Sequence, residues 1–366
     1  MRDLVELASS LVRIESINPD LGVGGSGEAA VAGAIAGWCE RAGLDVQLAE
    51  AAPGRPNVVA AARGRGGGGR TLLLNGHTDT VGVAGMDDPF SGRVDGDRLF
   101  GRGSYDMKGA VAACLVACER SARLGLRGDV VVTAVADEEV ASVGTEAVAR
   151  SVQAAGAIVA EPTEEQLGIA HRGFAGFHVH FAGRAAHGSR PDLGIDAISH
   201  AGPMLTRLGE LDRELAAGPG HALLGTGSVH ASVISGGQEY SSYPAFCDLY
   251  GERRTIPGEL EENVRRELAA LVADADATWQ VTLARGPFAV DPGEEIVGLV
   301  SRHAGQPSRI GLPFWTDAAL LQDAGIPSVL FGPCGEGAHA EVEWVSIESL
   351  QRCADVFVRV AEELCA

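Results

Sequence analysis

Histidine and carboxylate side chains follow four apolar runs of this chain, and a further carboxylate follows a glycine-rich loop. The runs and the side chains after them are Thr71–Leu74 before His77, Val130–Val135 before Glu138 and Glu139, Ala157–Ala160 before Glu161, and Pro327–Phe331 before His339. Asp106 ends the glycine-rich loop and begins an alanine-rich segment. Imidazole combined with carboxylate suits zinc or a similar first-row metal ion. These residue types therefore indicate metal chemistry.

A gathering of these carboxylates would need positive charge beside it. Two divalent ions about 3.5–4 Å apart, sharing one carboxylate, would supply that charge and form a hydrolytic centre. Bound zinc lowers the pKa of water to about 7, and a neighbouring glutamate can take the proton. Taken singly, each residue could be an ordinary polar side chain at a strand end. Glu138 and Glu139 could also be an acidic helix start.

The apolar runs predict the element that positions these side chains. Their continuous Val, Leu and Ile content is typical of strands covered on both faces, so we expect an α/β fold with a mostly parallel sheet flanked by helices. Ligands bind outside the carboxyl ends of strands in such sheets, which predicts one rim for the polar side chains. Long helices are expected over 107–124 and 348–364.

The middle of the chain follows a different pattern. Residues 174–181 alternate like an antiparallel strand, and the segments after them predict a helix, two strands and a helix at 196–214, 228–235, 243–254 and 259–274. This order indicates a smaller α+β domain inserted into the first domain. We therefore expect one domain made of 1–172 plus 283–366, and an inserted domain at 173–282.

Six segments of the chain, in order, resemble the successive motifs of the M20 metallopeptidases. They are Gly76-His-Thr-Asp-Thr80, Gly101-Arg-Gly-Ser-Tyr-Asp-Met-Lys-Gly109, Asp137-Glu-Glu139, Glu161-Pro162, Ala186-His-Gly-Ser189 and Ala338-His339. That family includes acetylornithine deacetylase, succinyl-diaminopimelate desuccinylase, glutamate carboxypeptidase and aminoacylase. The similarity spans essentially the whole chain, and it implies a two-metal catalytic domain with an inserted lid and dimerisation domain.

The resemblance also implies roles residue by residue. Five residues would bind two zinc ions, with cobalt or manganese as alternatives: His77 and Glu161 one ion, Glu139 and His339 the other, and Asp106 both. Glu138 would be the general base that holds the bridging water, and Asp79 would orient and polarise His77. Relatives commonly hold the peptide bond after the bridging aspartate in cis, so we expect a cis Asp106–Met107 bond.

Residues in the inserted segment and next to it would complete the site. His187 would stabilise the oxyanion of the reacting amide, and in the family the matching histidine reaches across from the other subunit of a dimer. Closure of the inserted domain would then assemble the site. Arg254 matches the arginine that grips a substrate carboxylate, and Arg172 and Arg190 are further candidates for that task. The alternatives are a surface histidine at 187 and a structural ion pair at 254.

Four departures from the family pattern affect the expected substrate contacts. Serine stands at 241, where an asparagine is usual before the proline, and no arginine follows Thr316-Asp-Ala. Cys334 replaces a common glycine, and Val342 replaces an acid. None of these changes removes a metal ligand. The sequence therefore predicts a class of substrate rather than one named compound.

Composition and charge exclude several classes of partner. The 366 residues contain 29 Lys and Arg against 49 Asp and Glu, a formal charge of −20. This charge argues against binding to nucleic acid or to an anionic membrane surface. No apolar run approaches about 18 residues, and we do not expect the first residues to be a signal peptide. Seven scattered cysteines without a CxxC motif indicate a reduced, cytoplasmic protein.

Three other patterns are interpreted as structural. His178 and His180 alternate on one strand face and could mimic a metal pair, but without a third ligand nearby we expect an exposed strand face. Gly22–Gly27 matches GxGxxG, yet no apolar strand precedes it, which argues against dinucleotide binding. Gly66–Gly69 is interpreted as a hairpin turn between strands at 57–62 and 70–74.

These expectations combine into one functional hypothesis with two alternatives. The chain is expected to be a cytoplasmic, homodimeric, two-zinc hydrolase that cleaves the amide bond of an N-acyl amino acid or a related small amide. A dipeptidase or carboxypeptidase of the same family is the nearest alternative. A non-catalytic binding protein on the same scaffold is the other, and it would be expected to lack ligands or the base, which this sequence retains.

Overall fold

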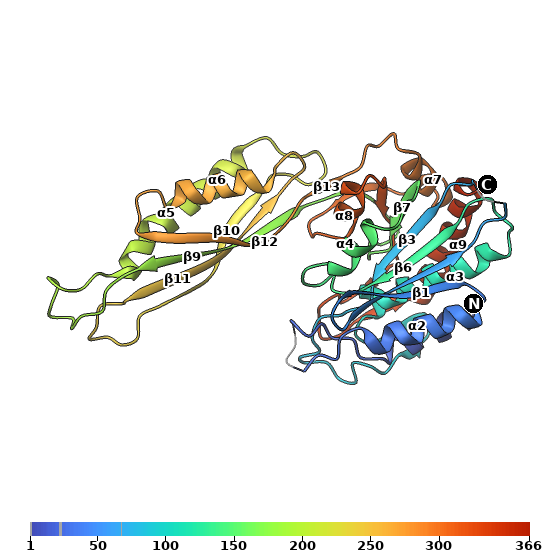
Figure 1. Ribbon diagram of the computed structural model, residues 1–366, viewed down its shortest axis with the longest axis horizontal. Helices are drawn as coiled ribbons and strands as arrows, with labels where there is room; N and C mark the ends of the chain where they lie inside the picture. Colours follow the sequence, from blue (N-terminus) through green and yellow to red (C-terminus); the bar gives the residue numbers. More distant parts are fainter. Residues whose placement is uncertain (1, 22–23, 67) are drawn as a thin grey trace. The chain divides into compact units, whose positions relative to one another are not determined.

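The computed structural model describes residues 2–21, 24–66 and 68–366 and divides into two compact units (Figure 1). The first unit contains the chain up to Ile169 together with 290–310 and 316–366, and the second contains 170–289 with 311–315. The boundaries expected from the sequence, 173 and 282, both lie inside the second unit.

Helices and strands alternate along most of the chain. Up to residue 171 the elements are α1 (Arg2–Val12), α2 (Ala29–Arg41), β1 (Asp45–Ala52), β2 (Arg55–Ala62), β3 (Leu72–His77), β4 (Arg93–Asp95), β5 (Arg98–Phe100), the short π-helix η1 (Ser104–Lys108), α3 (Gly109–Ala122), β6 (Val130–Val135), α4 (Val143–Ala149), β7 (Gly156–Val159) and β8 (Leu167–His171). The middle elements are β9 (Gly173–Ala182), α5 (Ala197–Ala217), β10 (Ser228–Gly236), β11 (Phe246–Thr255), α6 (Glu261–Leu271), β12 (Ala277–Arg285) and β13 (Phe288–Ala289). The last are α7 (Glu295–His303), β14 (Arg309–Leu312), α8 (Ala318–Asp323), β15 (Ser328–Leu330), β16 (Gly335–Glu336), β17 (Trp344–Ser346) and α9 (Ile347–Leu364). Within the described residues, none of these helices combines the length and the apolar character needed to cross a bilayer.

The main sheet has the strand order β1-β2-β6-β3-β7-β15-β8-β13, and β14 pairs with β8. Its centre, β6-β3-β7-β15, is parallel, and the strands on both sides of that centre pair antiparallel. Every residue of β3 and β6 is buried, as expected for strands covered on both faces. The prediction of a mostly parallel sheet in an α/β fold is therefore confirmed.

Helices cover the two faces of this sheet, with α3 and α9 on one side and α4 and α8 on the other (Figure 1). Ser346 caps the start of α9, because its hydroxyl accepts a hydrogen bond from the amide of Ser349. Leu350, Phe357 and Leu364 then recur at helical spacing on its buried face. Both long helices expected from the sequence are present.

The prediction of a hairpin between 57–62 and 70–74 is wrong. Strand β2 pairs with β1 and β6, and β3 lies between β6 and β7. A glycine-rich turn signals that the chain reverses, but it does not select the pairing partner, and here β6 inserts between the two strands. The glycine turn includes Gly67, and the GxGxxG segment includes Gly22 and Val23, which lie outside the described residues.

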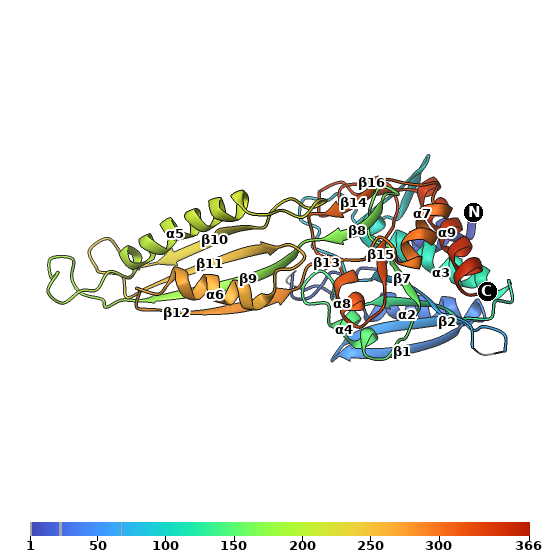
Figure 2. The same ribbon diagram turned by 90° about the horizontal axis from the view of Figure 1, so that it is seen from above.

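The second unit contains an antiparallel sheet with the order β10-β11-β9-β12 (Figure 2). Along β9, buried and half-buried residues alternate, so one face of the strand is inside. Phe177, Val179 and Phe181 from that face join Met204 of α5 and Leu268 of α6 in one hydrophobic core. Helices α5 and α6 therefore cover this face.

Candidate metal centre

Side chains from five separated positions meet at the carboxyl end of the main sheet. The Nε2 atom of His77, the last residue of β3, lies 3.1 Å from Asp106 Oδ1 and 3.9 Å from Glu161 Oε1. The Nε2 atom of His339 lies 3.4 Å from Asp106 Oδ2 and 3.1 Å from Glu139 Oε2. Asp106 is therefore placed between the two histidines, with one oxygen toward each. The structure brings all five expected ligand residues together.

The two histidines differ in their exposure. The side chain of His77 is 1 % exposed, whereas that of His339 is 55 % exposed. His77 also lies within metal-ligand spacing of Glu138 and Glu161 as one group, and of Asp106 and Glu139 as another. The cluster is thus closed on the His77 side and open to solvent at His339.

The backbone after β3 fixes the orientation of His77. Its Nδ1 atom lies 2.9 Å from the carbonyl oxygen of Asp79. A carbonyl oxygen only accepts hydrogen bonds, so Nδ1 carries the donating proton and Nε2 remains available as a ligand atom. The carboxylate of Asp79 is 3.6 Å from the same nitrogen, longer than a hydrogen bond. The carbonyl group of Asp79 is thus the closer partner of the histidine.

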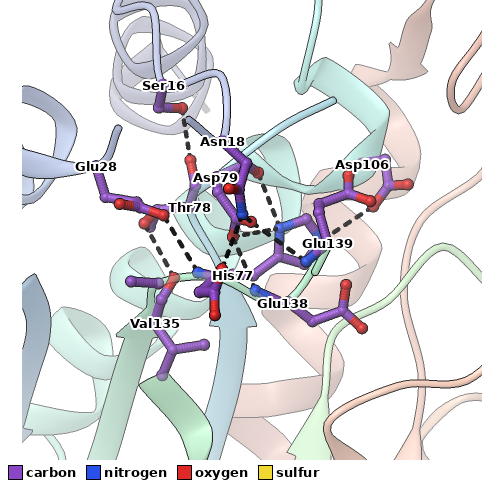
Figure 3. Close-up of polar contacts among 12 residues, drawn as sticks. Ser16, Asn18, Glu28, His77, Thr78, Asp79, Asp106, Val135, Glu138 and Glu139 are labelled. Atoms are coloured by element: carbon purple, nitrogen blue, oxygen red, sulfur yellow. Dashed lines mark hydrogen bonds and ion pairs between the residues drawn. The ribbon is translucent and has the colours of Figure 1, made fainter. Parts of the chain in front are cut away.

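The carboxylate of Asp79 instead holds the turn that carries Glu138 and Glu139 (Figure 3). It accepts hydrogen bonds from the backbone amides of Glu138 at 3.1 Å and Glu139 at 3.2 Å, and from the side-chain amide of Asn18 at 2.8 Å. Burial opposes its ionisation, but His77 and these hydrogen bonds lower the pKa of Asp79 below its usual value. An ionised Asp79 therefore positions the candidate base and a candidate ligand.

A buried ion-pair cluster supports the other side of this turn. Arg55 donates hydrogen bonds to Glu28 at 2.8 and 2.7 Å and to Asp137 at 2.9 Å. The side chain of Glu28 is fully buried, and one of its oxygens also accepts the amide of Asp137 at 3.2 Å. Asp137 adopts a positive φ of 72°, a conformation that a non-glycine residue keeps only where its surroundings hold it.

A second buried pair, Arg102 with Glu343, holds the segment that carries Asp106. Glu343 accepts the backbone amides of Gly103 at 3.1 Å, Tyr105 at 2.9 Å and Asp106 at 3.1 Å. Arg102 donates to Glu343 at 2.6 Å and to the carbonyl oxygen of Ala340 at 2.9 Å, one residue after His339. The pair thus joins the two loops that supply Asp106 and His339.

The sequence reasoning missed Glu343 and Arg102 as site residues. Two features of the sequence pointed to them: Glu343 follows His339 by four positions, and Arg102 stands between two glycines of a family motif. The prediction of a cis peptide bond between Asp106 and Met107 is confirmed.

Burial and charged neighbours shift the pKa values of this cluster. Burial, followed by the repulsion of Glu161, raises the pKa of Glu138, and burial also raises the pKa values of Glu139 and Glu161. Hydrogen bonds with Asp106 and Glu139 raise the pKa of His339 to about 10. The protein thus gathers negative charge that only protons or cations can balance.

The cluster fits divalent metal ions in a second respect. The Oε1 atom of Glu139 is buried and has no hydrogen-bond partner, although buried carboxylate oxygens are nearly always paired. Two imidazoles with three carboxylates are donors that zinc and related ions accept. A bound cation would be the partner that this buried oxygen lacks.

Asp317 is a further acidic residue near this centre that the sequence reasoning did not select. It is buried, and the hydroxyl of Thr145 donates to it at 2.7 Å, while its other oxygen has no partner. Burial raises the pKa of Asp317 to about 6. The signal in the sequence is the acid of Thr316-Asp-Ala.

The remaining four candidates, one histidine and three arginines, lie in the second unit and contact residues of that unit. His187 is exposed, with Nδ1 2.7 Å from the hydroxyl of Ser189. The arginines have protein partners: Arg254 donates twice to Glu252, at 2.5 and 3.1 Å, Arg190 donates twice to Asp192, and Arg172 donates to the carbonyl of Leu224 at 2.7 Å. Arg172 alone keeps a buried nitrogen, Nε, without a partner.

Comparison with known families places residues 73–363 within the model of peptidase family M20/M25/M40. An acetylornithine deacetylase from Myxococcus xanthus is 31 % identical over 336 residues, covering 87 % of this chain and 86 % of the relative. An N-formyl-4-amino-5-aminomethyl-2-methylpyrimidine deformylase from Bacillus subtilis (strain 168) is 29 % identical over 395 residues, covering 95 % and 91 %.

The fold is also similar to that of a solved structure. A dinuclear-metal-binding peptidase of the M20 family from Bacillus subtilis aligns with a TM-score of 0.74 at 18 % identity. The alignment covers 99 % of this chain and 97 % of that one. Both units are therefore represented in the shared fold.

Proposed function

This chain belongs to peptidase family M20/M25/M40, and we propose that it is a two-metal deacylase that cleaves the amide bond of an N-acyl amino acid. Membership of the family makes it a hydrolase that acts on amides. The proposal adds the number of ions, their ligands, the base and the substrate class. Zinc is the expected ion, and cobalt or manganese are the alternatives.

One observation carries this proposal: Asp106 faces His77 with one oxygen and His339 with the other. A carboxylate that bridges two ions must present its oxygens in this way. Glu161 then completes one set of ligands and Glu139 the other. Both sets retain the mixed nitrogen and oxygen donors that zinc takes.

When bound, the two ions would make a water molecule nucleophilic near neutral pH and would polarise the amide carbonyl. Glu138 is the residue that would take the proton of that water and later deliver it to the leaving amine. Its backbone amide is held by Asp79, and burial with nearby Glu161 raises its pKa. A carboxylate with a raised pKa is a better proton acceptor near neutral pH than an unperturbed one.

The second unit would supply the remaining groups. We assign His187 to the oxyanion and Arg254, Arg172 and Arg190 to the substrate carboxylate. The pairing of Arg254 and Arg190 with acids means that a substrate would have to compete for them, whereas Arg172 has an unpaired buried nitrogen. Arg172 is therefore the arginine best prepared for a ligand.

The proposal includes a cytoplasmic homodimer. All seven cysteines are free, and six of them are buried, which suits a reducing compartment. Edge strand β10 exposes Val233 and Ile234 by 56 % and 50 %. Exposed apolar residues on an unpaired strand edge favour pairing with a second chain.

A dipeptidase or carboxypeptidase is the second candidate function, because a peptide bond and an N-acyl amide present the same carbonyl to the centre. The relatives also act on unlike groups, since one is named for an acetyl and another for a formyl substrate. A panel of N-acetyl and N-formyl amino acids beside matched dipeptides separates these activities. Each substrate is assayed with chelated protein and again after zinc is restored.

We expect hydrolysis of one or more N-acyl amino acids only after zinc is restored. Faster turnover of dipeptides would replace the deacylase by the second candidate. Turnover that survives complete chelation would remove the proposal altogether.

A further inference from the structure

Two histidines of β9 and an aspartate of β11 form a separate cluster in the second unit. His178 Nε2 lies 2.7 Å and His180 Nδ1 lies 2.9 Å from the same atom, Asp248 Oδ1. The two strands are neighbours, in a register that pairs Asp248 with His180. The adjacent strand therefore places a carboxylate beside this histidine pair, a contact that local sequence cannot reveal.

The cluster lies on the face of the sheet opposite the hydrophobic core. His178 and His180 alternate with Phe177, Val179 and Phe181, which point into that core. Their side chains are 21 % and 42 % exposed, and that of Asp248 is 22 % exposed. The three polar groups are thus partly shielded and still open to ions from solution.

Neighbouring side chains orient the ring of His178 and keep the carboxyl group of Asp248 ionised. The ring of His178 stacks on that of Tyr250, with centroids 4.4 Å apart and planes at 14°. Burial opposes ionisation of Asp248, but the two imidazoles hold the pKa of its carboxyl group below the usual value. Thr278 and Gln280 of β12 stand in register opposite His180 and His178, so polar positions border the cluster on its other side.

We propose that His178, His180 and Asp248 form a binding site for one divalent first-row metal ion, with zinc as the expected ion. Two imidazoles and one carboxylate are a common set of protein ligands for such ions, and water completes the coordination. The ion would replace the two ring protons that point at the shared oxygen, while small side-chain rotations bring the ring nitrogens into ligand distance. It would join β9 to β11 and so stabilise the sheet of the second unit.

The test compares zinc content in three forms of the full chain. Wild type, the double variant His178→Gln with His180→Gln, and the control His230→Gln are dialysed to equilibrium against micromolar zinc and then analysed for bound metal. Glutamine can still donate a hydrogen bond to Asp248 but is a poor zinc ligand. His230 is an exposed histidine on β10 of the same sheet, so its loss controls for surface binding.

We expect wild type and the His230 variant to hold one zinc equivalent more than the double variant. Zinc should also raise the melting temperature of the full chain by more in wild type than in the double variant. Equal zinc content in all three forms would overturn the proposal, as would an equal loss in the His230 variant. Because the result is a difference between variants of the second unit, it does not depend on whether the centre in the first unit binds metal.

If the double variant does not fold, the single variant Asp248→Asn takes its place. It keeps both histidines and removes the anionic ligand, and we expect its zinc affinity to fall at least about tenfold. Unchanged affinity in a folded Asp248→Asn protein would also overturn the proposal.

Discussion

The backbone of Glu138 is held in place, and its side chain points to the candidate metal ligands. Asp79 holds its backbone, and its side chain lies within ligand spacing of His77 and Glu161. Replacing it by glutamine keeps the shape and removes the proton acceptor. We expect Glu138→Gln to lower kcat by about 10²–10⁴-fold while zinc content is unchanged, as measured by steady-state kinetics and metal analysis. Glu146→Gln, on α4, is the control, and a Glu138→Gln enzyme with near-normal kcat would contradict the assignment.

Glu343 acts on the centre through the backbone of the loop that carries Asp106. The carboxylate of Glu343 accepts hydrogen bonds from backbone amides of this loop. A glutamine at 343 would turn an N–H group toward some of these donors and lose the hydrogen bonds. We therefore expect Glu343→Gln to weaken metal affinity by about 10–100-fold, measured by competition with a chromophoric chelator.

Glu341 provides the matched control, because it is an exposed acid in the same loop. Glu341→Gln should leave metal affinity unchanged. Equal affinities for the Glu343 variant and wild type would show that the loop holds Asp106 without this carboxylate.

Residue types at strand ends, together with the family resemblance, predicted a set of candidate ligands, and the structure brings these side chains together. Glu343 and Asp317 could not be found in that way. The partners of Glu343 are backbone amides about 240 positions earlier, and the partner of Asp317 is a hydroxyl 172 positions earlier. No local pattern records such contacts.

At the scale of elements, the turn after β6 depends on a buried cluster rather than on its own conformation. Arg55 at the start of β2 is 11 % exposed and neutralises Glu28, which is fully buried. Removal of one partner of a buried pair leaves an uncompensated charge. We expect Arg55→Met to lower the free energy of unfolding by about 3–5 kcal/mol, measured by urea denaturation of the metal-free protein.

Arg63 directly follows the same strand, β2, and is the exposed arginine with which the Arg55 substitution is compared. Its side chain is 62 % exposed and pairs with Asp45 and Asp129. Arg63→Met should cost less than about 1 kcal/mol, because exposed ion pairs contribute little. Equal destabilisation by the two substitutions would contradict the account of the Arg55 cluster.

The elements themselves were predictable where periodicity is strong, and their pairing was less so. The alternation in 174–181 and the apolar run at 130–135 both became strands. The position of β6 between β2 and β3 could not be predicted, because parallel pairing depends on long connections that the local pattern does not encode.

At the scale of the whole molecule, the proposal adds His187 of the second unit to the centre of the first, and subunit exchange tests which subunit supplies it. If His187 acts on the site of the partner subunit, two inactive variants should complement each other. Glu138→Gln and His187→Ala proteins, mixed and allowed to exchange subunits, should recover up to about a quarter of wild-type activity, because half of the dimers are hybrids with one intact site. Light scattering during the same experiment measures the dimer.

Each variant alone is the control for this exchange. Activity that stays at the sum of the two separate variants would place His187 in its own subunit or outside the reaction. A monomer in solution would exclude the arrangement as well.

The central claim is that five side chains hold two ions that share Asp106, and anomalous X-ray scattering at the zinc edge tests it most directly. Crystals of the zinc-loaded protein should show two peaks about 3.5–4 Å apart, one beside His77 and Glu161 and one beside Glu139 and His339. A single peak, or none, between these residues in active protein would contradict the account.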